Sequence, residues 1–198
     1  MNYSQWYIAC FLQELGKKNP LSKKILGKDL VIFRNSKGEI SVLEDRCCHR
    51  NVQLSLGEVN GENIVCGYHG WQYNCDGKCA FIPSLPKEKE IPRTIRLKKY
   101  TQQIKHQAVW VWMGNEGEEH LAQIPPLTEL DDYQYVFNFH FVKSDLRLTA
   151  ESLFDAYHIG HVHKNSIGTF MGNLKDETVN FHLKIGEKRI AWRVRSYK

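Results

Sequence analysis

Two short pairs of metal-binding residue types constrain this chain more than any other feature of its sequence. Cys47 and His49 are separated by one residue, and sixteen residues later Cys66 and His69 are separated by two. Thiolate and imidazole groups are ligands of tetrahedral zinc, and they also hold a [2Fe–2S] cluster in which two histidines replace two cysteines on one iron. The sequence therefore predicts a metal centre built from two separate segments.

The surroundings of the two pairs favour the cluster over zinc. Zinc ribbons usually carry cysteines three residues apart in both halves, and Cys47 and His49 are closer than that. Turn residues follow each pair directly, Arg50-Asn51 in the first and Gly70 in the second. Two loop tips that clamp a cluster from opposite sides fit this pattern. A structural zinc module is the weaker alternative.

The chain has four further cysteines, Cys10, Cys48, Cys75 and Cys79. An even total of six fits disulfides in a secreted chain, but no export signal is recognisable, so the predicted compartment is the reducing cytoplasm. Cys48 is expected to be a passive thiol, and Cys75 and Cys79 flank a turn and are expected to be structural. Cys10 lies in an apolar strand and is predicted to be a small core residue.

Composition indicates a globular chain that neither spans a membrane nor is dedicated to nucleic acid. Hydrophobic residues make up 42% of the chain and charged residues 25%, and no apolar run approaches the roughly 18 residues of a membrane span. The net charge is +5, but the lysines are scattered and form no stripe with interleaved aromatic residues. We expect a soluble protein whose mildly basic surface also suits an acidic electron-transfer partner.

Apolar and β-branched segments between turn signals predict a mostly β first part. The segments expected to form strands there are Asp29–Phe33, Ile40–Leu43, Ile64–Cys66, Gln72–Tyr73, Ala80–Ile82, Thr94–Leu97 and Ala108–Trp112. The acidic, glycine-containing stretch Gly114–Glu119 and the pair Pro125-Pro126 then mark a connector. We accordingly expect two domains, residues 1–118 and 119–198.

The second part is expected to be α+β. Strand patterns occur at Tyr133–Val142, His182–Ile185 and Arg189–Val194. Leu148–His163 is the one convincing helix, with Leu153, Phe154 and Tyr157 at core-facing spacing.

The same helix carries Glu151, Asp155, His158, His161 and His163. At 100° per residue, His158 and His161 lie about 60° apart on one face, and so do Asp155 and His158. His158 and His163 lie about 140° apart and can share a metal only if the helix breaks, which Gly160 permits. Spacing alone thus favours His158 with His161, and a merely polar helix end is the alternative.

The first motif with its neighbours resembles the Rieske non-haem iron oxygenases. The matching segments are Glu44-Asp45-Arg46, Cys47-Cys48-His49-Arg50, Leu54-Ser55-Leu56-Gly57, Cys66-Gly67-Tyr68-His69-Gly70-Trp71, Asp76-Gly77-Lys78 and Val109-Trp110-Val111-Trp112-Met113-Gly114. Within that family the chain is most similar to the vanillate O-demethylase-like group of oxygenase components. The resemblance implies that Cys47 and Cys66 ligate one iron of a [2Fe–2S] cluster and that His49 and His69 ligate the other.

Some positions depart from related patterns. In the oxygenase family a proline is usual at Cys48 and a glycine at Asn51. High-potential Rieske proteins of respiratory complexes join the two loops by a disulfide, but the matching positions here are Val52 and Tyr68. Trp71 also replaces the serine whose hydroxyl bonds a cluster sulfur in those proteins. With fewer hydrogen bonds to stabilise the reduced state, we expect a potential near the low end of the Rieske range, about −150 mV.

The second motif resembles the oxygenase pattern Asp-x2-His-x4-His, whose histidines hold a mononuclear iron. The resemblance implies that His158 and His163 ligate Fe(II) and that Asp155 bridges toward a Rieske histidine of a neighbouring subunit in a homotrimer. In the family, a carboxylate far downstream completes this iron site. The carboxylates that follow here are Asp176, Glu177 and Glu187, none of them in a recognisable context.

The resemblance implies a Rieske [2Fe–2S] β-sandwich domain followed by a truncated α+β helix-grip catalytic domain. The implied oxygenase component takes electrons from an NAD(P)H-dependent reductase or a ferredoxin, through the [2Fe–2S] cluster, to the mononuclear iron. The implied reaction is O2-dependent hydroxylation or demethylation of an organic, aromatic substrate. Because the third iron ligand is not recognisable, a Rieske ferredoxin-like electron carrier without catalysis is the alternative.

Overall fold

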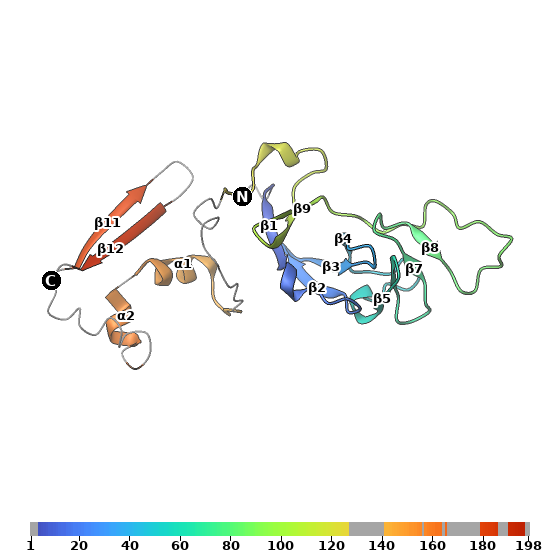
Figure 1. Cartoon of the computed structure of the whole chain (residues 1–198), viewed down its shortest axis with the longest axis horizontal. Coiled ribbons are helices and arrows are strands. Elements are labelled where there is room, and N and C mark those ends of the chain that lie inside the picture. The colour runs from blue at the N-terminus through green and yellow to red at the C-terminus, as the bar shows by residue number, and fades with distance from the viewer. Residues whose placement is uncertain are drawn as a thin grey trace. The chain divides into compact units, whose positions relative to one another are not determined.

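The computed structural model describes residues 4–126, 141–155, 157–163, 165, 179–185 and 190–196 (Figure 1). The chain divides into two compact units, Met1–Phe137 and Asn138–Lys198. Three antiparallel sheets form the described part of the first unit, and two helices and a strand pair form that of the second. The predicted mostly β fold is confirmed.

The strands of the first unit are short and pair with antiparallel neighbours. The first sheet has the order β1 (Trp6–Phe11), β10 (Ala108–Trp112), β9 (Gln102–Lys105). The second has the order β2 (Leu21–Ile25), β3 (Lys28–Arg34), β4 (Ile40–Glu44). The third has the order β5 (Glu58–Asn60), β6 (Asn63–Val65), β7 (Gln72–Tyr73), β8 (Cys79–Phe81). Single turns of 3-10 helix lie at Leu12–Glu14, Leu54–Leu56 and Glu119–Leu121.

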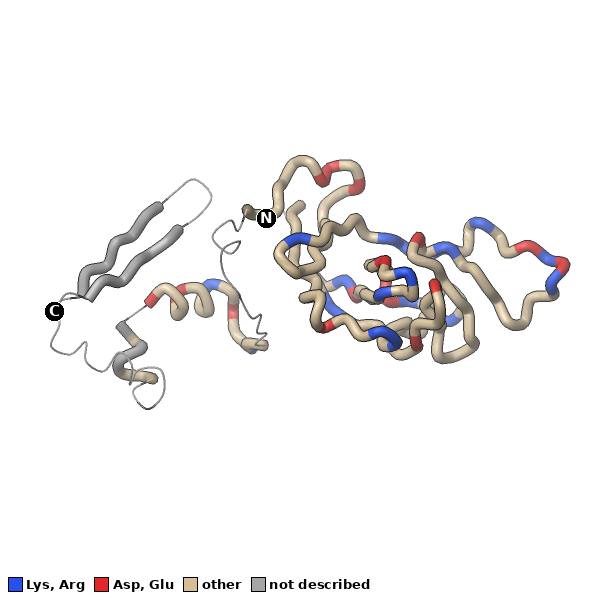
Figure 2. The backbone as a smooth tube through the Cα atoms, viewed as in Figure 1, with Lys and Arg blue, Asp and Glu red and all other residues tan. Residues whose placement is uncertain are grey.

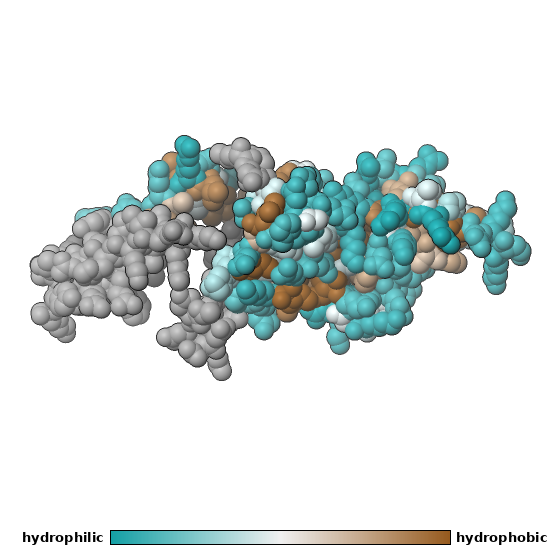
Figure 3. All heavy atoms as spheres, turned by 90° about the horizontal axis from the view of Figure 1, so that it is seen from above, coloured by the Kyte–Doolittle hydropathy of each residue, from teal (hydrophilic) through white to brown (hydrophobic). Residues whose placement is uncertain are grey.

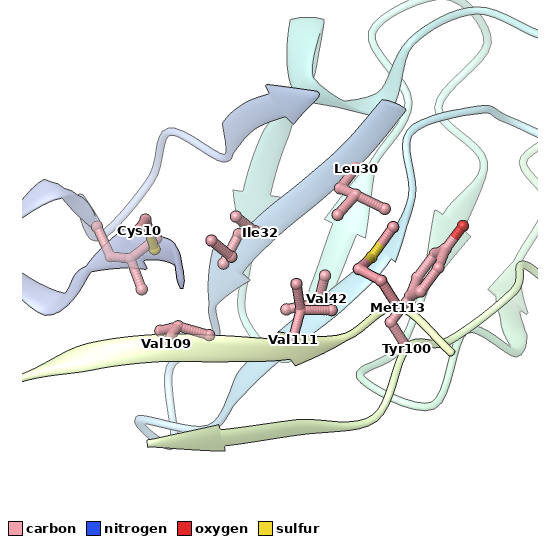
Figure 4. Close-up of a cluster of buried hydrophobic side chains, with 10 residues drawn as sticks. Cys10, Leu30, Ile32, Val42, Tyr100, Val109, Val111 and Met113 are labelled. Atoms are coloured by element: carbon pink, nitrogen blue, oxygen red, sulfur yellow. The ribbon is translucent and has the colours of Figure 1, made fainter. Parts of the chain in front are cut away.

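Strand β3 lies at the centre of the first unit because both of its faces are buried. Leu30 and Ile32 join the hydrophobic cluster drawn in Figure 4, which includes side chains from β1 and β10. Val31 and Phe33 join a second cluster, together with residues of the third sheet. Such an uninterrupted apolar run is typical of a strand covered on both sides, and each buried side chain contributes about 1.5–3 kcal/mol. The second sheet is therefore the middle layer of a β-sandwich.

The cluster of Figure 4 also contains Cys10, as the sequence predicts. Its side chain is buried in the same cluster as Ile32 and Val109, and burial raises its pKa to about 12. Cys10 is therefore a protonated core residue at neutral pH.

Most strands predicted for the first unit are present, with bounds that differ by a residue or two, and one prediction is wrong. Thr94–Leu97 is not a strand: a turn closed by the bond from Ile95 N to Pro92 O begins it, and Arg96 forms only an isolated bridge with Lys78. Strands β2, β5 and β9 are missed because exposed polar residues dominate them.

The second unit contains α1 (Leu146–Phe154), α2 (Tyr157–Val162) and the antiparallel strands β11 (Val179–Ile185) and β12 (Ile190–Ser196). The two strands confirm those predicted near residues 182 and 190. The single helix predicted over Leu148–His163 is wrong, because the backbone becomes extended at Asp155, with φ −84° and ψ 95°. Gly160 lies inside α2 and is not the break. Helix α1 also begins two residues earlier, where the Asp145 carboxylate accepts from Arg147 N at 2.8 Å.

The core positions predicted on the helix are also corrected. Leu153 is 72% exposed and Phe154 52%, and α1 contains no buried residue. An amphipathic helix buries its apolar side only against another layer, and the described part of the second unit places none over α1. The side chain of Tyr157 lies outside the described part of the structure. Of the strand predicted at Tyr133–Val142, residues 133–140 also lie outside it. The last two residues, Phe141 and Val142, are described and are not in a strand.

The surface of the first unit carries charges of both signs. Ion pairs join Lys23 to Glu14, Lys24 to Asp29, Lys37 to Glu62 and Lys99 to Asp76. Figure 2 shows the two signs interspersed along the backbone, most clearly in the loop after β8, and hydrophilic side chains cover much of this unit in Figure 3. Among the described residues, no helix combines the length and hydropathy that crossing a bilayer requires.

Candidate metal centres

Two loops with the same backbone pattern carry the predicted cluster ligands. In the first loop, Cys47 N donates to Val52 O at 2.8 Å and Asn51 N donates to Cys47 O at 2.9 Å. The second loop repeats these bonds at the same offsets, from Cys66 N to Trp71 O at 2.8 Å and from the amide of residue 70 to the Cys66 carbonyl at 3.0 Å. Each cysteine therefore begins a closed six-residue loop, and each histidine lies within it.

Both loops need a left-handed residue at their fourth position after the cysteine. Asn51 has φ 58° and Gly70 has φ 70°. Asparagine enters this region more readily than most residues other than glycine. The departure from glycine at Asn51 is therefore compatible with the loop geometry.

The two cysteines are buried and adjacent. Cys47 is 1% exposed and Cys66 3%, and both belong to the hydrophobic cluster that contains Val31 and Tyr73. Burial raises the pKa of Cys47, and the neighbouring Cys66 adds to this rise. Hydrogen bonds from Tyr73 and from the backbone of His49 oppose it. A pair of thiols surrounded by apolar groups and hydrogen-bond donors is thus available to a metal.

The two histidines lie at the exposed loop tips and face each other. The ring centroids of His49 and His69 are 4.6 Å apart, with an angle of 62° between the planes. Partial desolvation, followed by the charges of His69 and Arg50, lowers the pKa of His49. The neutral imidazole, which is the form that binds a metal, is thereby favoured.

The four side chains thus form two pairs, a buried pair of thiols and an exposed pair of imidazoles. This donor set fits a two-iron cluster in which each pair holds a different iron. Within the residues that the structure describes, no three His, Cys, Asp or Glu side chains gather closely enough to hold a single metal ion. The pairing therefore favours the [2Fe–2S] interpretation over zinc.

Two aromatic residues contact the candidate ligands, and the sequence analysis did not predict these contacts. Trp71 stacks on His49, with 5° between the ring planes and 4.8 Å between the centroids. The hydroxyl of Tyr73, which is fully buried, lies 3.2 Å from Cys47 Sγ and accepts from the amide of Cys48 at 3.2 Å. Their positions two and four residues after His69, at the start of a strand, are the signal that points to them.

A buried carboxylate and a glycine lie next to the two ligand loops and hold the turn that packs against them. Asp45 accepts from Ser55 N at 2.8 Å, from Ser55 Oγ at 2.6 Å and from Ser22 Oγ at 3.2 Å. Gly57 follows the same 3-10 turn, and a Cβ there would lie 1.9 Å from Val65 O. The turn Leu54–Leu56 is therefore tied to the first loop and packed directly against the start of the second.

The remaining thiols of this region make local contacts. Cys48 is exposed, with Sγ 3.4 Å from the carbonyl of Arg96. Cys75 accepts from Asn35 Nδ2 at 3.4 Å, and Cys79 Sγ lies 3.7 Å from the Phe81 carbonyl. All six cysteines are free thiols.

The second candidate centre lies between the two helices of the second unit. The rings of His158 and His163 are 5.3 Å apart at 66°. His158 Nδ1 is hydrogen-bonded to the Asp155 carbonyl and lies 3.9 Å from the Asp155 carboxylate. Both histidines follow the break at Asp155: His158 lies inside α2 and His163 directly after its end. The end of α2, and not a break at Gly160, therefore lies between the two rings. The alternative partner His161 is exposed.

One shallow pocket collects the polar residues of this region. It is lined by Leu148, Glu151, Ser152, Asp155, His158, Val162 and His163. Glu151, a further carboxylate of the predicted helix, thus lines the same pocket as the two histidines. The candidates Asp176, Glu177 and Glu187 lie outside the described residues.

Comparisons with known proteins agree with the first centre. A family profile for the Rieske [2Fe–2S] domain matches residues 5–117. The chain is 32% identical over 165 residues to the vanillate O-demethylase oxygenase subunit of a Pseudomonas strain, HR199, which covers 82% of the chain and 45% of that protein. It is 31% identical to the chloroplast protein TIC 55 of Pisum sativum, over 78% of the chain and 28% of that protein.

Solved structures give the same picture. The structure of NdmA from Pseudomonas putida CBB5 with caffeine matches 81% of the chain and 48% of its own, with a TM-score of 0.70 and 26% identity. The chain thus spans less than half the length of these relatives. A Rieske domain carries a [2Fe–2S] cluster, and the oxygenase relatives use a mononuclear iron, so the predicted cofactors are confirmed at the level of the family.

Proposed function

The chain belongs to the Rieske [2Fe–2S] domain family, and from this premise we propose that it is the electron-accepting part of a Rieske non-haem iron oxygenase component. Residues 1–118 are proposed as the Rieske domain and 119–198 as the beginning of the catalytic domain. The match over residues 5–117 and the named oxygenase relatives support this division and this role.

The single observation that carries the proposal is the pairing of the four ligands. We assign Cys47 and Cys66 to the buried iron of a [2Fe–2S] cluster and His49 and His69 to the outer iron. When bound, the cluster supplies one-electron transfer and the mononuclear iron supplies open positions for O2. The imidazole pair is exposed and the thiol pair is not, so an electron donor approaches from the histidine side.

In the second unit, His158 and His163 are assigned as ligands of the mononuclear iron. Asp155 then orients His158, because its carbonyl and carboxylate both lie beside Nδ1 and leave Nε2 for the metal. The proposed bridge from Asp155 to a neighbouring subunit's Rieske histidine, and hence a homotrimer, rests on the family resemblance.

The partners proposed for this chain are an NAD(P)H-dependent reductase or ferredoxin, O2 and an aromatic substrate. The names of the relatives support an aromatic ring, since one is a vanillate demethylase subunit and another was solved with caffeine. When a methyl group is bound through oxygen or nitrogen, its hydroxylation with O2 and two electrons from the reductase gives a hydroxymethyl group. This group leaves as formaldehyde, and the substrate is thereby demethylated. Six free thiols suit a reducing compartment, and we propose the cytoplasm.

Iron and acid-labile sulfide, measured per chain on anaerobically purified protein, test the proposal. About three irons to two sulfides are expected if both centres fill, and His158→Ala or His163→Ala should then lower the count to about two. Protein that contains zinc and no sulfide would refute the assignment of the first centre.

A Rieske ferredoxin-like carrier is the second candidate. It is favoured by the absence of a third, closely gathered metal-ligating side chain beside His158 and His163 in the described part of the chain. It predicts about two irons to two sulfides in the wild type, with no change in either histidine variant.

A further inference from the structure

Trp71 belongs to one ligand loop and contacts the histidine of the other. Its carbonyl accepts from Cys66 N at 2.8 Å and so closes the second loop, which contains His69. Its indole ring lies flat on His49 in the first loop, at 5° and 4.8 Å between centroids. One residue thus connects the two loops through its backbone on one side and its ring on the other.

The stack on Trp71 restricts rotation of the His49 ring. His49 is exposed at a loop tip, and the torsion that turns a histidine ring is broad, so its plane is poorly defined unless a neighbour holds it. Parallel contact with a larger ring, itself half-buried against the hydrophobic cluster of the thiols, limits this rotation. In this arrangement the ring centroids of His49 and His69 lie 4.6 Å apart, with 62° between the ring planes.

No covalent link performs this task between the two loops. All six cysteines are free, and Val52 and Tyr68 occupy the positions where a loop-to-loop disulfide would require cysteine. Tyr68 also lies close to His69, at 3.8 Å between ring centroids, but it is 62% exposed and belongs to the same loop as that histidine. Among these residues, the contact of Trp71 with His49 is the one aromatic contact between the two loops besides that of the two imidazoles themselves.

We propose that Trp71 is a positioning residue that clamps the two ligand loops together and fixes the ring plane of His49 for the cluster. The proposal rests on the proposed ligation by His49 and His69. It adds the residue that keeps the ring of His49 in a fixed orientation relative to His69. Trp71 touches neither substrate nor the reacting atoms; it acts through His49.

The test compares Trp71→Phe, Trp71→Leu and Trp71→Ala in the full chain, with Phe81→Leu as a matched control. Phe81 is an aromatic residue on β8 whose backbone pairs with Gln72, and its side chain is half exposed. Thermal unfolding of each apo-protein checks that the fold survives, and Trp71→Phe and Trp71→Leu keep the proposal testable if Trp71→Ala does not fold.

Two readouts follow the imidazole itself. Pulsed EPR of the reduced protein resolves the nitrogen couplings of the two coordinated histidines. We expect Trp71→Leu to change one coupling, Trp71→Phe to retain both, and Phe81→Leu to match the wild type. In the oxidised protein, a chelator should remove iron about two- to tenfold faster from Trp71→Leu than from the wild type, with rescue in Trp71→Phe, since an aromatic pair contributes this much.

Wild-type couplings and wild-type iron release in Trp71→Leu would overturn the clamp. Equal effects in Trp71→Leu and Trp71→Phe would also overturn it, because side-chain volume and not ring stacking would then be responsible. A wild type that binds a cluster without two histidine couplings, or binds none, would instead refute the proposed ligation.

Discussion

The hydroxyl of Tyr73 lies 3.2 Å from Sγ of Cys47, although the two residues are 26 positions apart in the chain. The tyrosine is fully buried, and burial keeps its pKa well above the usual range, so the hydroxyl remains a donor at neutral pH. Its oxygen also accepts from the amide of Cys48, which fixes its position. A fixed donor at a thiolate ligand stabilises the more negative, reduced state of a cluster.

We therefore expect Tyr73→Phe to lower the reduction potential. A hydrogen bond worth about 1 kcal/mol more in the reduced state corresponds to about 40 mV for a one-electron couple. A redox titration followed by the visible spectrum measures the shift. Tyr100→Phe is the control, because Tyr100 is also buried but belongs to the other core cluster. A potential unchanged in Tyr73→Phe would contradict this role.

Asp45→Ala is expected to destabilise the first unit by about 2–4 kcal/mol. The carboxylate is buried and accepts three hydrogen bonds from Ser22 and Ser55, which all lose their acceptor in the variant. Denaturant unfolding measures the change. Asp29→Ala provides the comparison, since its ion pair with Lys24 is exposed and should contribute less than about 1 kcal/mol. Similar values for the two variants would argue against a structural role of Asp45.

Gly57→Ala is expected to prevent assembly of the ligand loops. The added Cβ would lie 1.9 Å from the Val65 carbonyl, so the turn must move away from the second loop, at a cost above about 3 kcal/mol. Gly16→Ala should remain within about 0.5 kcal/mol of the wild type, because its nearest neighbour is 3.8 Å away. Unfolding curves and the iron content of both variants test the difference; normal iron content in Gly57→Ala would exclude the proposed close packing.

Glu14 is expected to make stability depend on acid pH. Burial raises the pKa of its carboxyl, but hydrogen bonds from Lys23 and from the Phe11 amide, at 2.8 and 2.7 Å, outweigh this effect and lower it overall. The carboxylate therefore contributes stability that is present above the unfolded pKa of about 4.3 and is lost as the pH falls through the lower, folded pKa.

The corresponding variant is Glu14→Gln. We expect it to lose about 1 kcal/mol of unfolding free energy at pH 7 and progressively less below about pH 4. Urea unfolding at several pH values measures this convergence. A difference from the wild type that stays constant down to pH 2 would show that the ionised carboxylate is not responsible.

Local sequence determined the parts of this protein that depend on few neighbouring residues. The cluster donors are recognisable because each pair of ligands lies within one short loop, and β3 is recognisable because its four consecutive apolar residues require burial on both faces. The mostly β architecture follows from such segments, as does the placement of Cys10 in the core.

Long-range packing decided which residues of distant segments contact one another. The stack of Trp71 on His49 and the bond between Tyr73 and Cys47 join residues that are more than 20 positions apart, and no local pattern encodes such pairs. The continuous helical pattern over residues 148–163 gave no sign of the break at Asp155 or of the end of α2 at Val162, beyond which His163 lies close to His158. Sequence thus specified the donors and the loops that hold them, whereas tertiary structure decided their neighbours, because contacts between distant segments depend on the fold as a whole.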